Sequence, residues 1–222
     1  MAQRRLPTAP VPRVIRACVL PAGRETPVSV YRKLRGAGAS FLLERAAGGE
    51  DESCYSMVGV EPWRILTAWP NHIELREGER KQSVSLDEGD VLSVLAGLLR
   101  DVPPLPQGPP PLASGAVGYL GYEALTALQT VAGPMLPDAV WLFCDVTVVL
   151  DHSSGQMWVV AQAPVERSWP AARARAAERL AAAVACLRAP LPIEPDRRAI
   201  GPAVPARAYF SSAAYAAAVR RI

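Results

Sequence analysis

The sequence predicts an α+β fold in which mainly antiparallel sheets are covered by helices. Half of the 222 residues are hydrophobic, which suffices for one sizeable core or two small ones. Short apolar runs bounded by turn residues occur in clusters, and only a few longer stretches have helical spacing. Because strands and helices do not alternate one by one, this order disfavours the repeated strand–helix units of a parallel sheet.

The first predicted elements are a short helix and a strand. Thr26 can cap a helix that has Pro27 in its first turn, apolar residues up to Leu34 and Gly36 just past its end. Residues 40–44 then have the composition of a strand.

Three further apolar runs follow, at residues 55–60, 64–69 and 72–76. Glu61-Pro62 separates the first two runs, and the third alternates into a Glu77-Gly78 turn. Three consecutive antiparallel strands are the simplest interpretation.

A second helix is predicted between Asp87, which can cap it, and Pro103-Pro104. Its apolar residues recur at helical spacing, so this stripe is expected to face the sheet. The stripe consists of Val91, Leu92, Leu95, Leu98 and Leu99. Residues 102–111 are so rich in proline that they predict an extended connector.

Residues 114–122 form a strand-like run that contains Gly115, Gly118 and Gly121. The run lacks the Lys and hydroxyl pair of a phosphate loop, and it lacks the dinucleotide-binding fingerprint. We therefore interpret the glycines as places where two backbones approach closely. A short helix is predicted at 123–128.

The most hydrophobic part of the chain predicts a central hairpin. Residues 140–150 are almost continuously apolar, residues 151–155 have turn composition, and residues 156–163 form the second strand. Asp151-His152 resembles half of a catalytic pair, but both residues fall in the turn, where Asp favours local backbone hydrogen bonds.

An Ala-rich helix is predicted over 168–187, and Ser211 can cap a further helix. Together with the Arg-rich and Pro-rich start, these features divide the chain into four regions. They are a flexible basic arm at 1–13, a folded domain at 14–188, a Pro-rich linker at 189–210 and the beginning of another domain at 211–222.

Composition argues against several classes of function. The net charge of +3 comes without a long run of one sign, so no nucleic-acid partner is expected, and no stretch is apolar enough to cross a membrane. The two histidines, His72 and His152, lie far from any ligand cluster, so no metal site and no catalytic residue is predicted. Four cysteines without C-x-x-C spacing favour a cytoplasmic location.

Several segments resemble, in order, the N-terminal domain of anthranilate synthase component I and of its relative, aminodeoxychorismate synthase component I. The segments are 26–34 (TPVSVYRKL), 40–44 (SFLLE), 55–59 (YSMVG), 115–122 (GAVGYLGY), 136–139 (LPDA) and 151–152 (DH). Residues 210–219 resemble the lead-in to the chorismate-binding domain of these enzymes. The Thr-Pro-Val start and the Leu-Leu-Glu strand favour anthranilate synthase.

This resemblance implies the N-terminal half of the layered α/β/β/α fold of chorismate-utilising synthases. The complete enzyme converts chorismate, with ammonia that a glutamine amidotransferase subunit supplies, into anthranilate and pyruvate for tryptophan biosynthesis. Chorismate, magnesium and the acid and base groups belong to a C-terminal domain that this chain lacks. For the chain itself, the resemblance therefore implies no catalytic residue, no cofactor and no activity by itself.

The family also contributes to a tryptophan effector site through a Leu-Leu-Glu-Ser motif, which aligns with Leu42, Leu43, Glu44 and Arg45. Arg45 replaces the family's Ser. A charged guanidinium that can only donate hydrogen bonds does not imitate a hydroxyl group. Weak or absent tryptophan binding is therefore predicted.

Two alternatives stay open. One is the N-terminal part of aminodeoxychorismate synthase component I, an enzyme of the folate pathway. The other is a stand-alone, non-catalytic binding module, which requires the last short helix to be stable without neighbours.

Overall fold

The computed structural model describes residues 11–44, 55–85, 91–105, 107–110, 113–121, 136–192 and 209–221. The chain divides into two compact units, Met1–Leu191 and Pro192–Ile222. The first unit contains the sheet and three helices of the described residues, and the second contains one helix. Their structures are considered separately.

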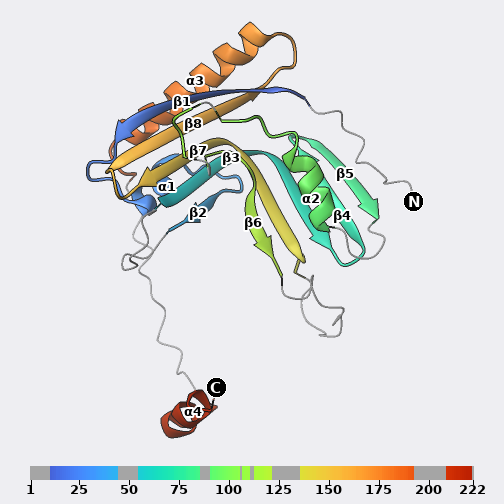
Figure 1. Cartoon of the computed structure of the whole chain (residues 1–222), viewed down its shortest axis with the longest axis vertical. Helices are drawn as coiled ribbons and strands as arrows, with labels where there is room; N and C mark the ends of the chain where they lie inside the picture. The colour runs from blue at the N-terminus through green and yellow to red at the C-terminus, as the bar shows by residue number, and fades with distance from the viewer. Residues whose placement is uncertain are drawn as a thin grey trace. The chain divides into compact units, whose positions relative to one another are not determined.

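The strands of the first unit form a single antiparallel sheet (Figure 1). Its order is β1-β8-β7-β3-β4-β5, while β2 pairs with β3 and β6 pairs with β7. The strands are β1 (Arg13–Pro21), β2 (Phe41–Leu43), β3 (Tyr55–Trp69), β4 (His72–Glu77), β5 (Arg80–Ser85), β6 (Val117–Leu120), β7 (Ala139–Asp151) and β8 (Gln156–Pro164). The predicted α+β class with an antiparallel sheet is confirmed.

The long strands β3 and β7 form the central ribbon of this sheet, and they bend together near Glu61. The sequence predicted two separate strands here, which is wrong, because β3 runs without interruption from Tyr55 to Trp69. Glu61 has a φ of 54°, and the pairing with β7 shifts register between Pro62 and Arg64. A bulge of this kind inserts a residue and bends the strand without ending it.

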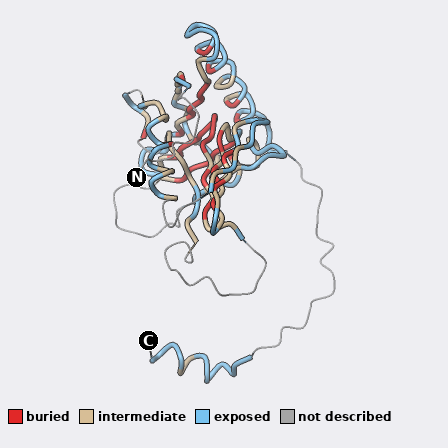
Figure 2. The backbone as a smooth tube through the Cα atoms, turned by 90° about the vertical axis from the view of Figure 1, so that its right-hand side faces the viewer, coloured by how far each residue is buried: buried red, intermediate tan, exposed pale blue. Residues whose placement is uncertain are grey.

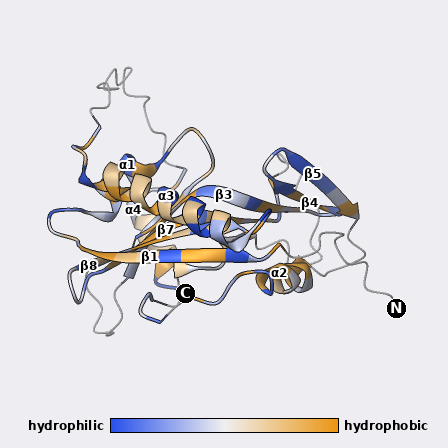
Figure 3. Ribbon diagram, turned by 90° about the horizontal axis from the view of Figure 1, so that it is seen from above, coloured by the Kyte–Doolittle hydropathy of each residue, from blue (hydrophilic) through white to orange (hydrophobic). Residues whose placement is uncertain are grey.

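The sequence analysis did not predict two of the strands. Residues 80–85 pair with β4 as β5, and β1 pairs with β8 along its whole length. Strand β1 carries both hydrophilic and hydrophobic segments (Figure 3), so it lacks the alternation that marks a half-buried strand. It begins at Arg13, a residue assigned to the basic arm, whose side chain is buried.

Helices α1 (Pro27–Leu34) and α3 (Trp169–Arg188) cover the half of the sheet that contains β1, β8 and the first part of β3. Thr26 caps α1 as predicted, in a capping box with Ser29, and Ser168 caps α3, where its side chain accepts from the Ala171 amide. Alanines 172, 176 and 183 are buried, which lets α3 lie close to the strands (Figures 1 and 2).

Alternate residues of the central strands point to opposite faces of the sheet. Val146, Val148 and Leu150 pack with α1 and α3 in one apolar cluster. Val149, between them in sequence, packs in another cluster with Met57 and Val160. Because both faces are covered, β7 is apolar at nearly every position, which explains the continuous run in the sequence.

Helix α2 (Val91–Leu99) packs on the other half of the sheet, against Leu66, Ile73 and Leu75. The predicted stripe is confirmed in part, because Val91, Leu95 and Leu98 contact this cluster, whereas Leu92 and Leu99 are exposed. Residues 87 and 123–128, a predicted cap and a predicted helix, lie outside the described residues.

The second unit contains α4 (Ser212–Val219), which Ser211 caps as predicted through a bond from the Ala214 amide. None of its residues is buried, and Tyr215 and Val219 are exposed.

Candidate functional site

A buried cluster of charged side chains lies where the central ribbon bends. Asp145 of β7 forms ion pairs with Arg13 of β1 and with Arg179 of α3, whose Nη2 lies 3.0 Å from Oδ2. The side chains of Asp145 and Arg13 are 7% and 4% exposed. Arg179 also donates from Nε to Glu61 Oε2 at 3.0 Å, so the cluster joins three strands and one helix.

This cluster fills a gap in the hydrogen bonding of the sheet. Strand β8 pairs with β7 only as far as Ala161, opposite Val146, although it continues alongside β1 to Pro164. Strand β6 pairs with the same edge of β7, but over Ala139 to Leu142. Between the segments of β7 that pair with β8 and with β6, side chains take the place of backbone hydrogen-bond partners. Arg179 Nη1, for example, donates to the Gln162 carbonyl at 2.6 Å.

Burial has the largest effect on the pKa values of the ionisable groups in this gap. It raises the pKa of Asp145 to about 6, although Arg13 and Arg179 both oppose that shift. Burial likewise lowers the pKa of Arg13, again against the attraction of Asp145. The neighbouring Cys144 thiol has its pKa raised to about 12, mainly by burial, so this thiol stays protonated and unreactive.

Trp63 extends the cluster toward the other half of the sheet. The guanidinium groups of Arg13 and Arg64 both lie over its ring, with their central carbons 4.0 Å and 4.5 Å from the ring centroid. Arg64 in turn donates to Glu77 at 2.6 Å and to Asp101 at 3.1 Å. The aromatic ring thus links the ion pairs of both halves.

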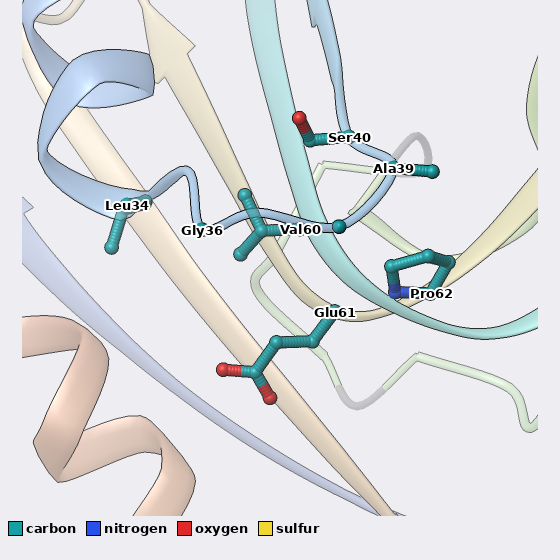
Figure 4. Close-up of a pocket in the computed structure, with 8 residues that line it drawn as sticks. Leu34, Gly36, Ala39, Ser40, Val60, Glu61 and Pro62 are labelled. Carbon is teal, nitrogen blue, oxygen red and sulfur yellow. The ribbon is translucent and has the colours of Figure 1, made fainter. Parts of the chain in front are cut away.

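A half-open cavity of about 170 Å³ lies beside the bend. It is bounded by the loop after α1, with Gly36, Ala39 and Ser40, and by Glu61 on β3 (Figure 4). Figure 4 shows the Glu61 carboxylate directed away from Ser40. The positive φ of Glu61 is a conformation that non-glycine residues rarely adopt. Its ion pair with Arg179 gives a structural reason for a glutamate there.

A second cavity of about 170 Å³ is lined by residues of β2, β3 and β7 and by residues 114–117. Its apolar walls include Phe41, Leu43 and Met57, and its polar groups include Ser114 and Thr147. Of the predicted effector residues, Leu43 therefore lines this cavity, Glu44 is exposed just after β2, and Arg45 lies outside the described residues.

The turn interpretation of Asp151 and His152 is confirmed. Asp151 accepts hydrogen bonds from Ser153 and Ser154, which lower its pKa, and it does not orient the imidazole. His152 Nε2 does lie 2.8 Å from Ser56 Oγ. However, Ser56 is completely buried, so no substrate can reach this hydroxyl group.

Within the residues that the structure describes, no group of three or more His, Cys, Asp and Glu side chains could hold a metal ion. No helix among those residues is long and apolar enough to span a bilayer.

The sequence interpretation missed the charged cluster. One signal was present, because Asp145 interrupts an apolar run, and a buried acid is rarely unpaired. Its partners carry no such signal: Arg13 is 132 residues away, and Arg179 lies on an Ala-rich helix among other arginines.

Comparison with known proteins shows the family. No family model matches the chain. Anthranilate synthase component 1 of Cereibacter sphaeroides is 34% identical over 213 residues, which cover 91% of this chain and 43% of the relative. The Synechocystis protein of that name is 30% identical over 185 residues, which cover 78% of this chain and 36% of the relative. The Acetivibrio thermocellus protein of that name is 28% identical over 149 residues, which cover 63% of this chain and 29% of the relative.

A solved structure, anthranilate synthase component I from Streptococcus pneumoniae, matches with a TM-score of 0.47 and 19% identity over 76% of this chain and 36% of that one. The chain spans less than half the length of the curated relatives that it matches. The α+β domain is therefore one part of a larger kind of protein. It belongs to the family of anthranilate synthase component 1 and corresponds to the N-terminal region, as the resemblance indicated.

Proposed function

We propose that the chain is the regulatory and scaffolding N-terminal part of an anthranilate synthase component I. The observation that carries this proposal is the 34% identity to one such protein over 91% of the chain. The complete enzyme would convert chorismate and glutamine-derived ammonia into anthranilate and pyruvate, with a glutamine amidotransferase partner, in the cytoplasm. In this proposal, residues 14–188 form the N-terminal domain, 189–210 the linker and 211–222 the beginning of the chorismate-binding domain.

The described side chains support a non-catalytic role for this part. The most perturbed groups, Asp145 and Cys144, are buried: two arginine side chains pair with Asp145, and burial keeps the Cys144 thiol protonated. The family's magnesium does not fit the described residues, since no ligand cluster occurs among them. In this proposal, the chorismate chemistry uses residues of a further domain.

A domain exchange tests this function. The matched region of the Cereibacter sphaeroides protein is replaced by this chain, and anthranilate fluorescence is followed with chorismate, ammonia and magnesium. We expect the chimera to form anthranilate and the isolated chain to form none, because the chemical groups lie outside it. Turnover by the isolated chain would refute the proposal, as would a folded chimera, checked by circular dichroism, that is inactive.

Arg45 provides a prediction about regulation. We propose that Leu43, Glu44 and Arg45 occupy the family's effector site and that the guanidinium group excludes tryptophan. In the chimera, tryptophan should inhibit weakly, and Arg45→Ser should lower the inhibitory concentration by about tenfold or more, the effect of one good hydrogen bond. Equal inhibition of both chimeras would remove Arg45 from the site.

A further inference from the structure

Two polar atoms in the gap between β7 and β8 have no hydrogen-bond partner among the described residues. One is Arg13 Nε, which can only donate, and the other is Gln162 Oε1, which can only accept. The two residues are 8% and 3% exposed, so bulk water does not reach them freely. Buried polar atoms in folded proteins are nearly always paired, either with protein or with ordered water.

Strand register places these two atoms in the same part of the sheet. Gln162 lies opposite Ile15 on β1, and Arg13 is two residues from Ile15, so both side chains point to the same face. Both also contact adjacent residues of β7: Arg13 pairs with Asp145, and Gln162 Nε2 donates to the Cys144 carbonyl at 3.4 Å. An unpaired donor and an unpaired acceptor therefore converge on one gap.

The orientation of the Gln162 amide follows from its neighbours. The Cys144 carbonyl can only accept, so the amide NH2 group must face it. Exchanging the amide oxygen and nitrogen would set two acceptors against each other and would bury an unpaired donor instead. Rotation of the amide therefore does not satisfy the buried group, and the observed orientation, with Oε1 as the unpaired acceptor, is the one that keeps the bond to Cys144.

We infer that ordered water occupies this gap, accepting from Arg13 Nε and donating to Gln162 Oε1. Water is the smallest molecule that can do both, and polar cavities inside proteins are usually hydrated. The gap borders the second cavity, which Leu43 lines, because Ser114 and Cys144, which Gln162 contacts, both line it too. Water in the gap would also solvate the Arg13–Asp145 pair.

Two measurements on the full chain test this inference. A crystal structure at high resolution should show density within hydrogen-bond distance of both Arg13 Nε and Gln162 Oε1. Water-17O magnetic relaxation dispersion should show that Gln162→Leu loses at least one long-lived water, whereas Gln156→Leu, at an exposed position on the same strand, loses none.

Direct bonding of Arg13 Nε to Gln162 Oε1 in a dry gap would overturn the inference. The same holds if Gln162→Leu keeps every long-lived water of the wild type. Should Gln162→Leu fail to fold, the crystal structure of the unaltered chain still decides the question.

Discussion

Substituting Gly118→Ala should destabilise the first unit by about 3 kcal/mol or more, which is the upper range for overpacking a closed site. A Cβ atom at this position would lie 1.8 Å from the Val140 carbonyl oxygen and 2.7 Å from the Trp141 ring. The nearest obstacle is backbone of the paired strand β7, so no rotamer change relieves it. Either β6 separates from β7 or the ribbon shifts.

Thermal unfolding followed by circular dichroism measures this effect. At about 2–4 °C per kcal/mol for a domain of this size, the midpoint should fall by about 6–12 °C. Gly38→Ala is the matched control, because a Cβ at Gly38 would meet nothing within 4 Å, and its midpoint should change little. Equal midpoints for Gly118→Ala and the wild type would show that β6 is not packed as described.

Replacing Arg179 by Met should cost about 3 kcal/mol at pH 8. Methionine keeps the apolar stem but leaves the Gln162 carbonyl without its donor and Asp145 with Arg13 as the remaining ion-pair partner. The matched control is Arg175→Met, one helical turn earlier. Its pair with Glu166 is more than half exposed on both sides, so its loss should cost less than about 1 kcal/mol.

The cost of Arg179→Met should also depend on pH. Arg179 opposes the rise in the pKa of Asp145, so without it the pKa in the folded state moves further above 6. An acid whose pKa is higher in the folded than in the unfolded state loses stability as pH rises between the two values. In urea unfolding, the difference in the free energy of unfolding between Arg179→Met and the wild type should therefore be smaller at pH 4 than at pH 8. A cost that is independent of pH would show that Arg179 does not act on Asp145.

Of the two residues in these predictions, the sequence indicated a role for Gly118 but not for Arg179. The glycines of 114–122 were expected to permit close backbone approach, and Gly118 does so against Val140. By contrast, nothing in the local sequence of Arg179 separates it from Arg175, which lies exposed on the same helix. Which arginine becomes essential depends on where β8 leaves β7, and that is a property of the assembled sheet.

Local patterns determined the elements whose cause is local. The caps at Thr26 and Ser211, the Asp151 turn and the apolar strand β7 follow from the preferences of neighbouring residues, and each was predicted. The order of the motifs likewise indicated the family, because several motifs in the same order are more specific than any one of them.

Tertiary structure alone decided the continuity of β3 through its bulge, the pairing of the mixed-polarity strand β1, and the convergence of Arg13, Asp145 and Arg179. The physical reason is common to all three. A bulge, an edge strand and a buried ion pair are each stabilised by residues distant in sequence, so their free energy depends on contacts that exist only after the sheet has formed.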